Sequence, residues 1–86
     1  MRKRADWMVR ADDDILELMR DLQASSPAEL EKHLSYTKEH ISRRLRELWQ
    51  HQLIDRPARG IYRINENTIG YLNENVDASQ LERREE

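Results

Sequence analysis

Two helix start signals lie close together near the middle of this chain, and they limit the length of the helix between them. The first is SPAE at residues 26–29, where serine can cap a helix, proline suits its first position, and glutamate completes a capping box. The second is Thr37, a candidate cap for a helix over residues 38–50. The sequence therefore predicts a short helix with Leu30 and Leu34 facing inward, a tight turn, and a longer helix.

The longer stretch, KEHISRRLRELWQ at residues 38–50, separates apolar from cationic side chains. On a helical wheel Ile41, Leu45 and Leu48 share one side, which we expect to be buried, while polar and cationic residues occupy the other. The chain has a formal net charge of −2, yet residues 38–63 hold 7 cations against 3 acidic residues, a local excess of 4. The cations are therefore gathered on this predicted helix and on the segment that follows it.

Three further elements surround this pair of helices. Residues 12–23 predict a helix, because apolar side chains recur in them at helical spacing: Ile15, Leu18, Met19 and Leu22. Residues 53–56 and 61–64 predict two strands, and the link PARG between them has turn chemistry, with Gly60 free to take positive φ. A last helix is predicted from about residue 67 or 68 by a second helical stripe: Ile69, Leu72 and Val76.

This order of elements indicates a fold that is mainly α with a small β-hairpin. A short helix joined by a tight turn to a longer cationic helix is a helix-turn-helix, and the hairpin after it is a wing. We therefore expect a winged helix-turn-helix with a three-helix core, a two-stranded wing and a C-terminal helix. Along the chain we expect a basic arm at 1–10, the winged helix-turn-helix domain at 11–76, and an acidic, disordered tail at 77–86.

Composition argues against several classes of function. With 86 residues and no cysteine, the chain predicts one domain without disulfides or thiolate metal sites. Its histidines are irregularly spaced and it has neither a Ser-His-Asp set nor a Gly-rich phosphate loop, so we expect no enzyme and no cofactor. No apolar run reaches the roughly 20 residues of a membrane span, and no apolar segment follows the basic start. We therefore expect a cytoplasmic protein with no membrane partner and no small-molecule substrate.

The cationic side of residues 38–50 has the chemistry to read double-stranded DNA. An α-helix fits the major groove of B-DNA, where its first turns reach the base edges, and a wing arginine can enter the minor groove. Arginine pairs with guanine and glutamate accepts from cytosine, while the helix start around Tyr36 suits a phosphate. Arg44 lies toward the buried side, so we expect it to meet a phosphate or an acidic neighbour. The predicted DNA-binding residues are Thr37, Lys38, Glu39, His40, Ser42, Arg43, Arg44, Arg46, Arg59 and Arg63.

The sequence also resembles a known family. The block KEHISRRLREL…LI…GIYRI is typical of the recognition helix and wing of winged helix-turn-helix regulators. Together with ADWM near the start and DDDILELM after it, it makes the chain similar to small haloarchaeal proteins related to the repressor of the halophilic phage phi-H, over about residues 5–72. The resemblance implies a sequence-specific, repressor-like transcriptional regulator that forms a homodimer. Ser35 stands where such families often have a glycine in the turn.

Other interpretations of the same residues stay open. A winged helix can be a protein-interaction module, here through the acidic helix at 12–23 and the last helix, and an RNA-binding role is weaker because few aromatics are expected to be exposed. The basic start RKR is a candidate minor-groove arm, and the acidic blocks are expected to keep the remaining surface solvated. We expect Trp49 to pack between helix and wing. A homodimer can form through apolar residues outside the three-helix core: Trp7, Met8, Ile69, Leu72 and Val76.

Overall fold

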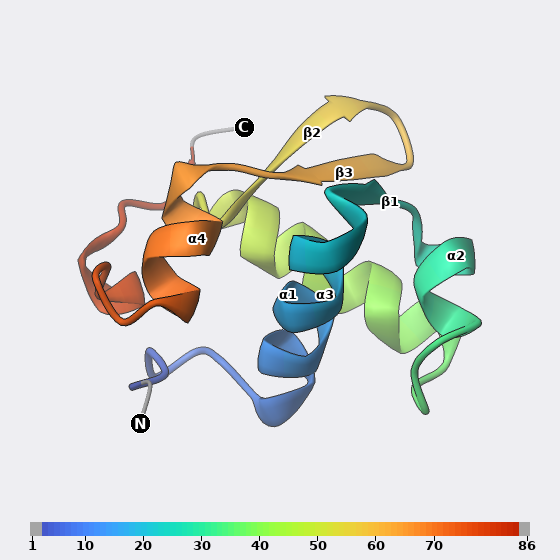
Figure 1. Cartoon of the computed structure of the whole chain (residues 1–86), viewed down its shortest axis with the longest axis horizontal. Helices are drawn as coiled ribbons and strands as arrows, with labels where there is room; N and C mark the ends of the chain where they lie inside the picture. The colour runs from blue at the N-terminus through green and yellow to red at the C-terminus, as the bar shows by residue number, and fades with distance from the viewer. Residues whose placement is uncertain (1–2, 85–86) are drawn as a thin grey trace.

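The computed structural model describes residues 3–84, and over them it has the expected winged helix-turn-helix architecture. In this range four α-helices meet around an apolar centre, and a three-stranded antiparallel sheet lies along one edge of the molecule (Figure 1). In chain order the elements are α1 (Arg10–Leu22), β1 (Ala24–Ser25), α2 (Pro27–Glu31), α3 (Lys38–Gln50), β2 (Ile54–Ala58), β3 (Ile61–Ile64), α4 (Glu66–Leu72) and the 3-10 helix η1 (Ala78–Gln80). The helix-turn-helix is α2 and α3, and β2 and β3 form the wing.

Both helix start signals in the middle of the chain are confirmed. The Ser26 hydroxyl accepts a hydrogen bond from the backbone N–H of Glu29 at 3.2 Å, and α2 begins directly after it. The Thr37 hydroxyl accepts from the backbone N–H of His40 at 3.2 Å, and α3 begins directly after it. Each cap satisfies one of the N–H groups that a helix start leaves without an intrahelical partner.

The outer helices differ from the prediction in where they begin and end. Helix α1 begins two residues earlier than expected, because the Asp12 carboxylate accepts from the backbone N–H of Val9 at 3.1 Å and caps the helix there. Helix α4 begins after Asn65, whose side-chain oxygen accepts from the backbone N–H groups of the first turn. It ends at Leu72, so Val76, which was predicted to extend its stripe, lies beyond it.

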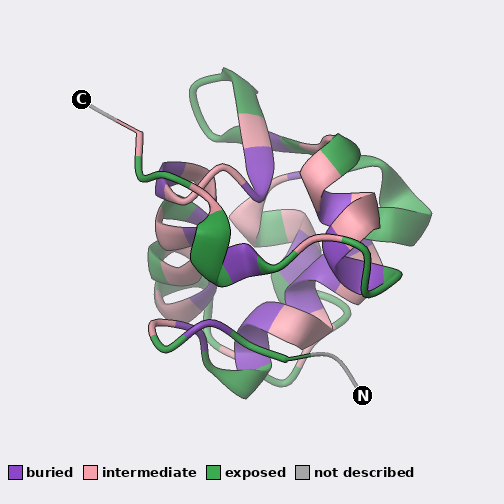
Figure 2. Cartoon of the chain, turned by 90° about the vertical axis from the view of Figure 1, so that its left-hand side faces the viewer, coloured by how far each residue is buried: buried purple, intermediate pink, exposed green. Residues whose placement is uncertain are grey.

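The core lies where α1 and α3 cross. It contains the whole predicted stripe of α3 but only part of that of α1, because Leu22 is exposed and Leu18 half-buried, while Leu16, outside the predicted stripe, is fully buried. From α3 the three apolar residues Ile41, Leu45 and Leu48 are fully buried. Helix α1 contributes Ile15 and Met19, also fully buried, and the short α2 adds a leucine to the same cluster. In Figure 2 the buried residues gather where the helices face one another, while the tip of the wing is exposed. The two long helices therefore hold each other through a common apolar centre.

The sheet has one strand more than expected. Helix α1 ends at Leu22. The following residue, Gln23, takes φ 72°, and the next two residues pair with β3 in the register Ala24↔Arg63 and Ser25↔Tyr62. The strand order is β1-β3-β2, so β3 is the central strand. The wing is thus anchored to the end of α1 as well as to α3, and the predicted two-stranded wing is corrected to a three-stranded sheet.

The wing itself is a tight hairpin with an irregularity in β2. Strand β2 continues to Ala58, so the loop shortens to Arg59 and Gly60, and Gly60 takes the expected positive φ of 78°. The register passes from Asp55↔Arg63 to Ala58↔Ile61, which leaves Arg56 and Pro57 together opposite Tyr62. Proline has no N–H to give to the ladder, and a bulge is where a strand tolerates it.

Asp12 does more than keep the surface solvated, which was the expected role of the acidic blocks. It is fully buried, and its carboxylate oxygens accept from the Nε and Nη2 atoms of Arg44 on α3 at 2.8 Å each. The same guanidinium donates to the backbone carbonyl of Trp7 at 3.1 Å. A buried carboxylate needs such a partner because its desolvation is costly, so this pair joins α1 to α3.

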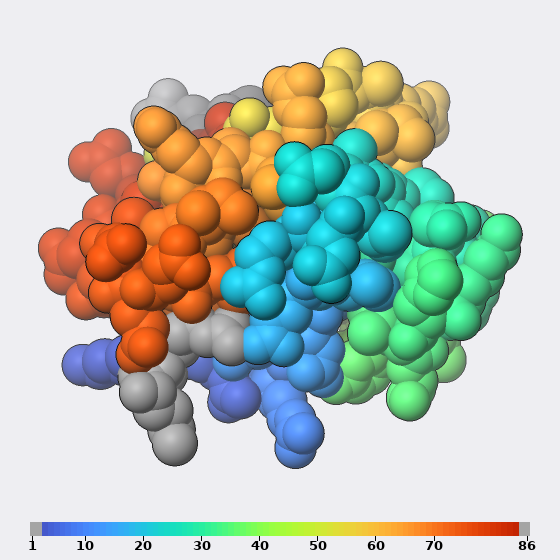
Figure 3. Space-filling view, in the orientation of Figure 1, coloured from blue at the N-terminus to red at the C-terminus, as the bar shows by residue number. Residues whose placement is uncertain are grey.

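The next two aspartates join α1 to three other segments. Asp13 accepts from Nε of Arg4 at 2.9 Å and from the hydroxyl of Tyr71 on α4 at 2.6 Å. Asp14 accepts from the hydroxyl of Tyr36, in the turn before α3, at 2.6 Å. Figure 3 shows α1 in blue and cyan with α4, in orange, on one side of it and α2, in green, on the other. The stretch DDD is therefore a hub to which the surrounding elements are tied.

The N-terminal segment does not extend away from the domain as an arm. Arg4 is paired with α1, Ala5 is buried, and the indole of Trp7 stacks on His51 with ring centroids 3.9 Å apart. Arg2, the first cation of the predicted minor-groove arm, lies outside the described residues. The prediction of a free basic arm is therefore wrong over residues 3–9, because apolar packing and an ion pair hold this segment against the domain.

The C-terminal segment is also packed rather than disordered over its described part. Ala78 is fully buried, and the guanidinium of Arg84 donates to the carbonyls of Trp49 and Ile54 and to the carboxylate of Asp55. These contacts reach the end of α3 and the base of the wing together. The expectation of a disordered tail from residue 77 is therefore wrong as far as residue 84, because arginine hydrogen bonds tie the segment down.

Two of the five residues predicted to form a dimer interface lie inside the monomer. Met8 and Leu72 are each only 7% exposed and belong to the core cluster, so they have little surface to offer a partner.

Within residues 3–84, no helix is long and apolar enough to cross a membrane, and no cluster of three metal-ligating side chains occurs.

Candidate nucleic-acid interface

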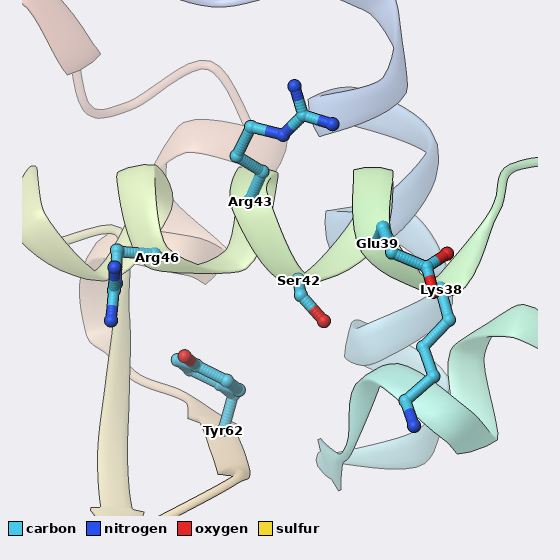
Figure 4. Close-up of a pocket in the computed structure, with 6 residues that line it drawn as sticks. All are labelled: Lys38, Glu39, Ser42, Arg43, Arg46 and Tyr62. Carbon is cyan, nitrogen blue, oxygen red and sulfur yellow. The ribbon is translucent and has the colours of Figure 1, made fainter.

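The outward side of α3 and the neighbouring strand β3 form an open groove of about 440 Å³. Five of its six lining residues come from the polar side of α3, and the sixth, Tyr62, comes from β3: Lys38, Glu39, Ser42, Arg43, Arg46 and Tyr62. Figure 4 shows Ser42 and Arg46 pointing toward Tyr62, with Lys38 and Glu39 at the other end and Arg43 on the far side of the helix. All five α3 residues were predicted from wheel position, and the structure brings them together.

The cations of this groove differ from most others in the chain by their lack of partners. Among residues 3–84, the side chains of Lys38, Arg43 and Arg46 make no ion pair or hydrogen bond, and all three are exposed. A paired arginine is held by its carboxylate, whereas these three are available to an external anion. The groove therefore presents three uncommitted positive charges and one carboxylate, that of Glu39.

Arg44, a predicted DNA-binding residue, points toward α1 and not into the groove. Its guanidinium faces Asp12 and the carbonyl of Trp7, and the hydrogen bond to Asp12 raises the pKa of Arg44 above its ordinary value. The acidic neighbour that wheel position allowed is therefore the partner found. Arg44 fixes α3 on α1 and does not line the groove.

The start of α3 is more occupied than the sequence predicted. The Thr37 hydroxyl caps the helix at the N–H of His40, and a carboxylate oxygen of Glu31 already accepts from the N–H of Lys38 at 2.9 Å. The Tyr36 hydroxyl donates a hydrogen bond to the Asp14 carboxylate, and this hydrogen bond raises the pKa of Tyr36. Thr37 and His40 are therefore not among the residues that line the groove, and the His40 ring is tilted against that of Tyr36 with the ring centroids 5.5 Å apart.

The two predicted arginines of the wing are placed differently. Arg59 lies at the exposed tip, and its side chain makes no hydrogen bond or ion pair within residues 3–84. Arg63 lies in the central strand, and its guanidinium is 4.0 Å from the carboxylate of Asp55, its cross-strand partner. A third arginine, Arg56, lies over the indole of Trp49 at 4.0 Å, so Trp49 does pack between helix and wing, as expected.

Tyr62 is the groove residue that is absent from the predicted DNA-binding set. It faces the helices from β3 and is 7% exposed. The residue type alone could have indicated this, because the hydroxyl of an inward-facing tyrosine needs either a hydrogen-bond partner or access to the surface. Here the surface that it reaches is the groove.

The family model described as winged helix-turn-helix phage repressor matches residues 1–84. The chain belongs to that family. Among solved structures, the crystal structure of the PhiH1 repressor-like protein from Haloarcula marismortui is similar, with 37% sequence identity, a TM-score of 0.88, and 98% of each chain covered. A search of curated proteins gave no match.

Membership in the phage repressor family confirms the resemblance drawn from the recognition helix and wing. The repressor family and the repressor-like structure together support a DNA-binding regulator, and such repressor-like winged helices are typically not enzymes. The shared fold covers the N- and C-terminal segments as well as the helix-turn-helix, since nearly the whole of both chains is matched.

Proposed function

We propose that this phage repressor family member is a sequence-specific regulator of transcription that binds double-stranded DNA. In this proposal α3 enters the major groove and the wing, β2 and β3, contacts the backbone or the adjacent minor groove. The observation that carries it is the groove surface of α3, where three cations without intramolecular partners stand beside a serine and a glutamate.

The charge distribution favours this surface over the rest of the protein. The chain as a whole has a formal charge of −2, and the aspartates of α1 neutralise Arg4 and Arg44 on other sides. Duplex DNA is a dense array of negative charge, so it is attracted to exposed cations without intramolecular partners, and α3 gathers three of them on one surface. The arrangement therefore directs DNA to the α3 side.

Individual roles follow from the chemistry of each side chain. Arg43 can pair with O6 and N7 of guanine, and Glu39 can accept from N4 of cytosine; one such pair discriminates by about 1–3 kcal/mol. Arg46, three residues further along α3, can reach either a guanine or a neighbouring phosphate. Ser42, between Glu39 and Arg43, suits either base edge. The remaining contacts are proposed to be with the backbone or minor groove: Thr37, Lys38, His40, Arg59 and Arg63.

We propose that two copies bind as a homodimer to two half-sites about one helical turn apart. Of the residues considered for the interface, Ile69 and Val76 keep part of their surface exposed, as does Trp7. They belong to segments on the side of the molecule away from α2 (Figure 1). Size-exclusion chromatography with light scattering measures this; a monomer mass at micromolar concentration, with and without DNA, would contradict the dimer.

The test of DNA binding is a double variant, Arg43→Ala with Arg46→Ala. Its binding to a fluorescent duplex from the region upstream of its own gene is measured by anisotropy. The matched control removes two cations outside the groove, Arg20 and Lys32. We expect the groove variant to lose binding while its thermal unfolding stays close to that of the wild type, and the control variant to bind normally. Equal binding by all three proteins would refute the proposal.

Salt is a second variable, because the similar crystal structure comes from a haloarchaeon. Phosphate contacts release counterions and weaken as salt rises, whereas base contacts and apolar contacts are less affected. We therefore expect specific binding to persist from about 0.1 M salt into the molar range while non-specific binding falls away. Loss of both together below molar salt would mean that phosphate attraction alone holds the DNA.

A further inference from the structure

The hydroxyl of Tyr62 is the one tyrosine hydroxyl of this chain that lacks a hydrogen-bond partner among residues 3–84. The sequence has 3 tyrosines. Tyr36 donates to Asp14 and Tyr71 to Asp13, each at 2.6 Å. Tyr62 is buried, as Tyr71 is, yet no side chain or carbonyl of the described range accepts a hydrogen bond from its hydroxyl.

A missing partner at this depth is unusual. Buried polar groups are nearly always hydrogen-bonded, because leaving a donor unsatisfied has a free-energy cost. Tyr62 is only 7% exposed, and the surface it retains opens into the groove beside α3. The ring is held by the core while the hydroxyl points at a place where a ligand can lie.

The surroundings of that hydroxyl identify the chemistry of the ligand. Figure 4 shows the hydroxyl end of Tyr62 on the same side of the groove as the guanidinium of Arg46, with Ser42 above the ring. All three line the groove and all three can donate hydrogen bonds. Glu39, which an anion would avoid, lies toward the opposite end. A site formed by a cation and two neutral donors suits an anionic oxygen, and phosphate in particular.

We propose that Tyr62 donates a hydrogen bond to a backbone phosphate of bound DNA, in the groove between α3 and β3, with Arg46 as the neighbouring cation. This inference rests on the proposed function. If α3 lies in the major groove and the wing beside it, one strand of the duplex passes between them, and its phosphodiester meets Tyr62. The phosphate contact sets how deeply α3 enters, so Tyr62 is a positioning residue for the base contacts.

The test compares Tyr62→Phe with Tyr71→Phe, a matched pair of buried tyrosines that lose only the hydroxyl. We expect Tyr62→Phe to bind the upstream duplex about ten- to a hundredfold more weakly, the loss that follows removal of a hydrogen bond to a charged acceptor. Its thermal stability should equal or exceed that of the wild type, because the hydroxyl has no partner in the free protein. Tyr71→Phe should show the reverse, lower stability with unchanged affinity, because Tyr71 bonds Asp13 away from the groove.

Salt dependence separates the neutral contact from a charged one. Tyr62→Phe should keep the wild-type slope of log affinity against log salt, whereas Arg46→Gln should lower that slope by about one, since only the arginine displaces a counterion. A changed slope in Tyr62→Phe would mean that the hydroxyl acts by holding Arg46, and would overturn the direct contact. A second duplex of equal length with a scrambled sequence serves as a control. The substitution Tyr62→Phe should weaken binding to it by the same factor as binding to the upstream duplex, because a phosphate contact is independent of sequence.

The outcomes distinguish this inference from the function on which it rests. If the wild type binds the upstream duplex and Tyr62→Phe binds equally well, the phosphate contact is wrong and the DNA-binding proposal stands. If Tyr62→Phe loses affinity only for the upstream duplex, the hydroxyl reads a base, and the phosphate contact is again wrong. If the wild type binds neither duplex, the proposed function fails and the inference fails with it.

Discussion

Replacing Arg44 with methionine should destabilise the protein by about 3–5 kcal/mol, the cost of breaking a buried ion pair from one side. Asp12 has no exposed surface, and Arg44 provides two of its three hydrogen bonds, each 2.8 Å long. After the substitution only the N–H of Val9 would remain to the carboxylate. Methionine keeps the apolar packing of the arginine stem, so the lost free energy of unfolding measures the ion pair and not the packing.

This loss is large compared with the total stability of a small domain, which is about 5–15 kcal/mol. For a chain of this size, each kcal/mol lowers the melting temperature by roughly 4–8 °C, so the expected fall is roughly 12–40 °C. Urea unfolding at fixed salt, followed by far-UV circular dichroism, measures the free energy directly. The matched control is Arg46→Met, two residues along the same helix but exposed in the groove, where we expect a change within about 0.5 kcal/mol.

The same two variants separate a structural arginine from a DNA-binding one. Under conditions where both are folded, Arg44→Met should bind DNA like the wild type, and Arg46→Met should not. The double variant Asp12→Asn with Arg44→Met should recover much of the lost stability, because it removes the buried charge as well as its partner. A loss below about 1 kcal/mol for Arg44→Met would refute the reasoning, since it would mean that the Asp12 carboxylate is hydrated.

Three smaller predictions concern pH, a helix cap and the wing. Burial lowers the pKa of His51 from 6.5, so the unfolded chain takes up a proton first as pH falls; stability should decline from pH 7.5 toward 5.5, and less steeply in His51→Gln. Parallel declines in urea titrations of both proteins would contradict this. Thr37→Ala should destabilise α3 by about 1 kcal/mol and Thr37→Ser by much less, as judged by melting temperature. Gly60→Ala should cost about 1–2 kcal/mol through strain at positive φ, although its Cβ would meet no other atom; a neutral effect would mean that the loop relaxes.

What could be predicted from the sequence was encoded between near neighbours. The caps at Ser26 and Thr37 depend on groups three residues away, and the buried side of α3 depends on spacing within one helix. Both were confirmed. The polar residues of the groove also followed from the wheel, because the side of a helix opposite its apolar stripe faces outward.

What escaped prediction depends on residues that are far apart in the chain. Strand β1 has only two residues and no alternating pattern, so only its pairing with β3 reveals it. The ion pair of Asp12 with Arg44 joins residues 32 positions apart. The Tyr62 hydroxyl lacks a partner because the folded chain places no acceptor beside it within residues 3–84. Such relations exist only once the helices have been packed, which is why the acidic stretch was interpreted as a solvated surface.

The three consecutive aspartates of α1 also bear on how this protein can be adapted to other conditions. Acidic residues are the targets for substitution when the net charge of −2 is to be made less negative. Here each carboxylate holds a different neighbour, Arg44, Tyr71 or Tyr36, and even glutamate is one methylene too long to keep those geometries. A redesign that spares these three positions and neutralises exposed acids elsewhere, such as Asp21 and Glu66, should retain the fold.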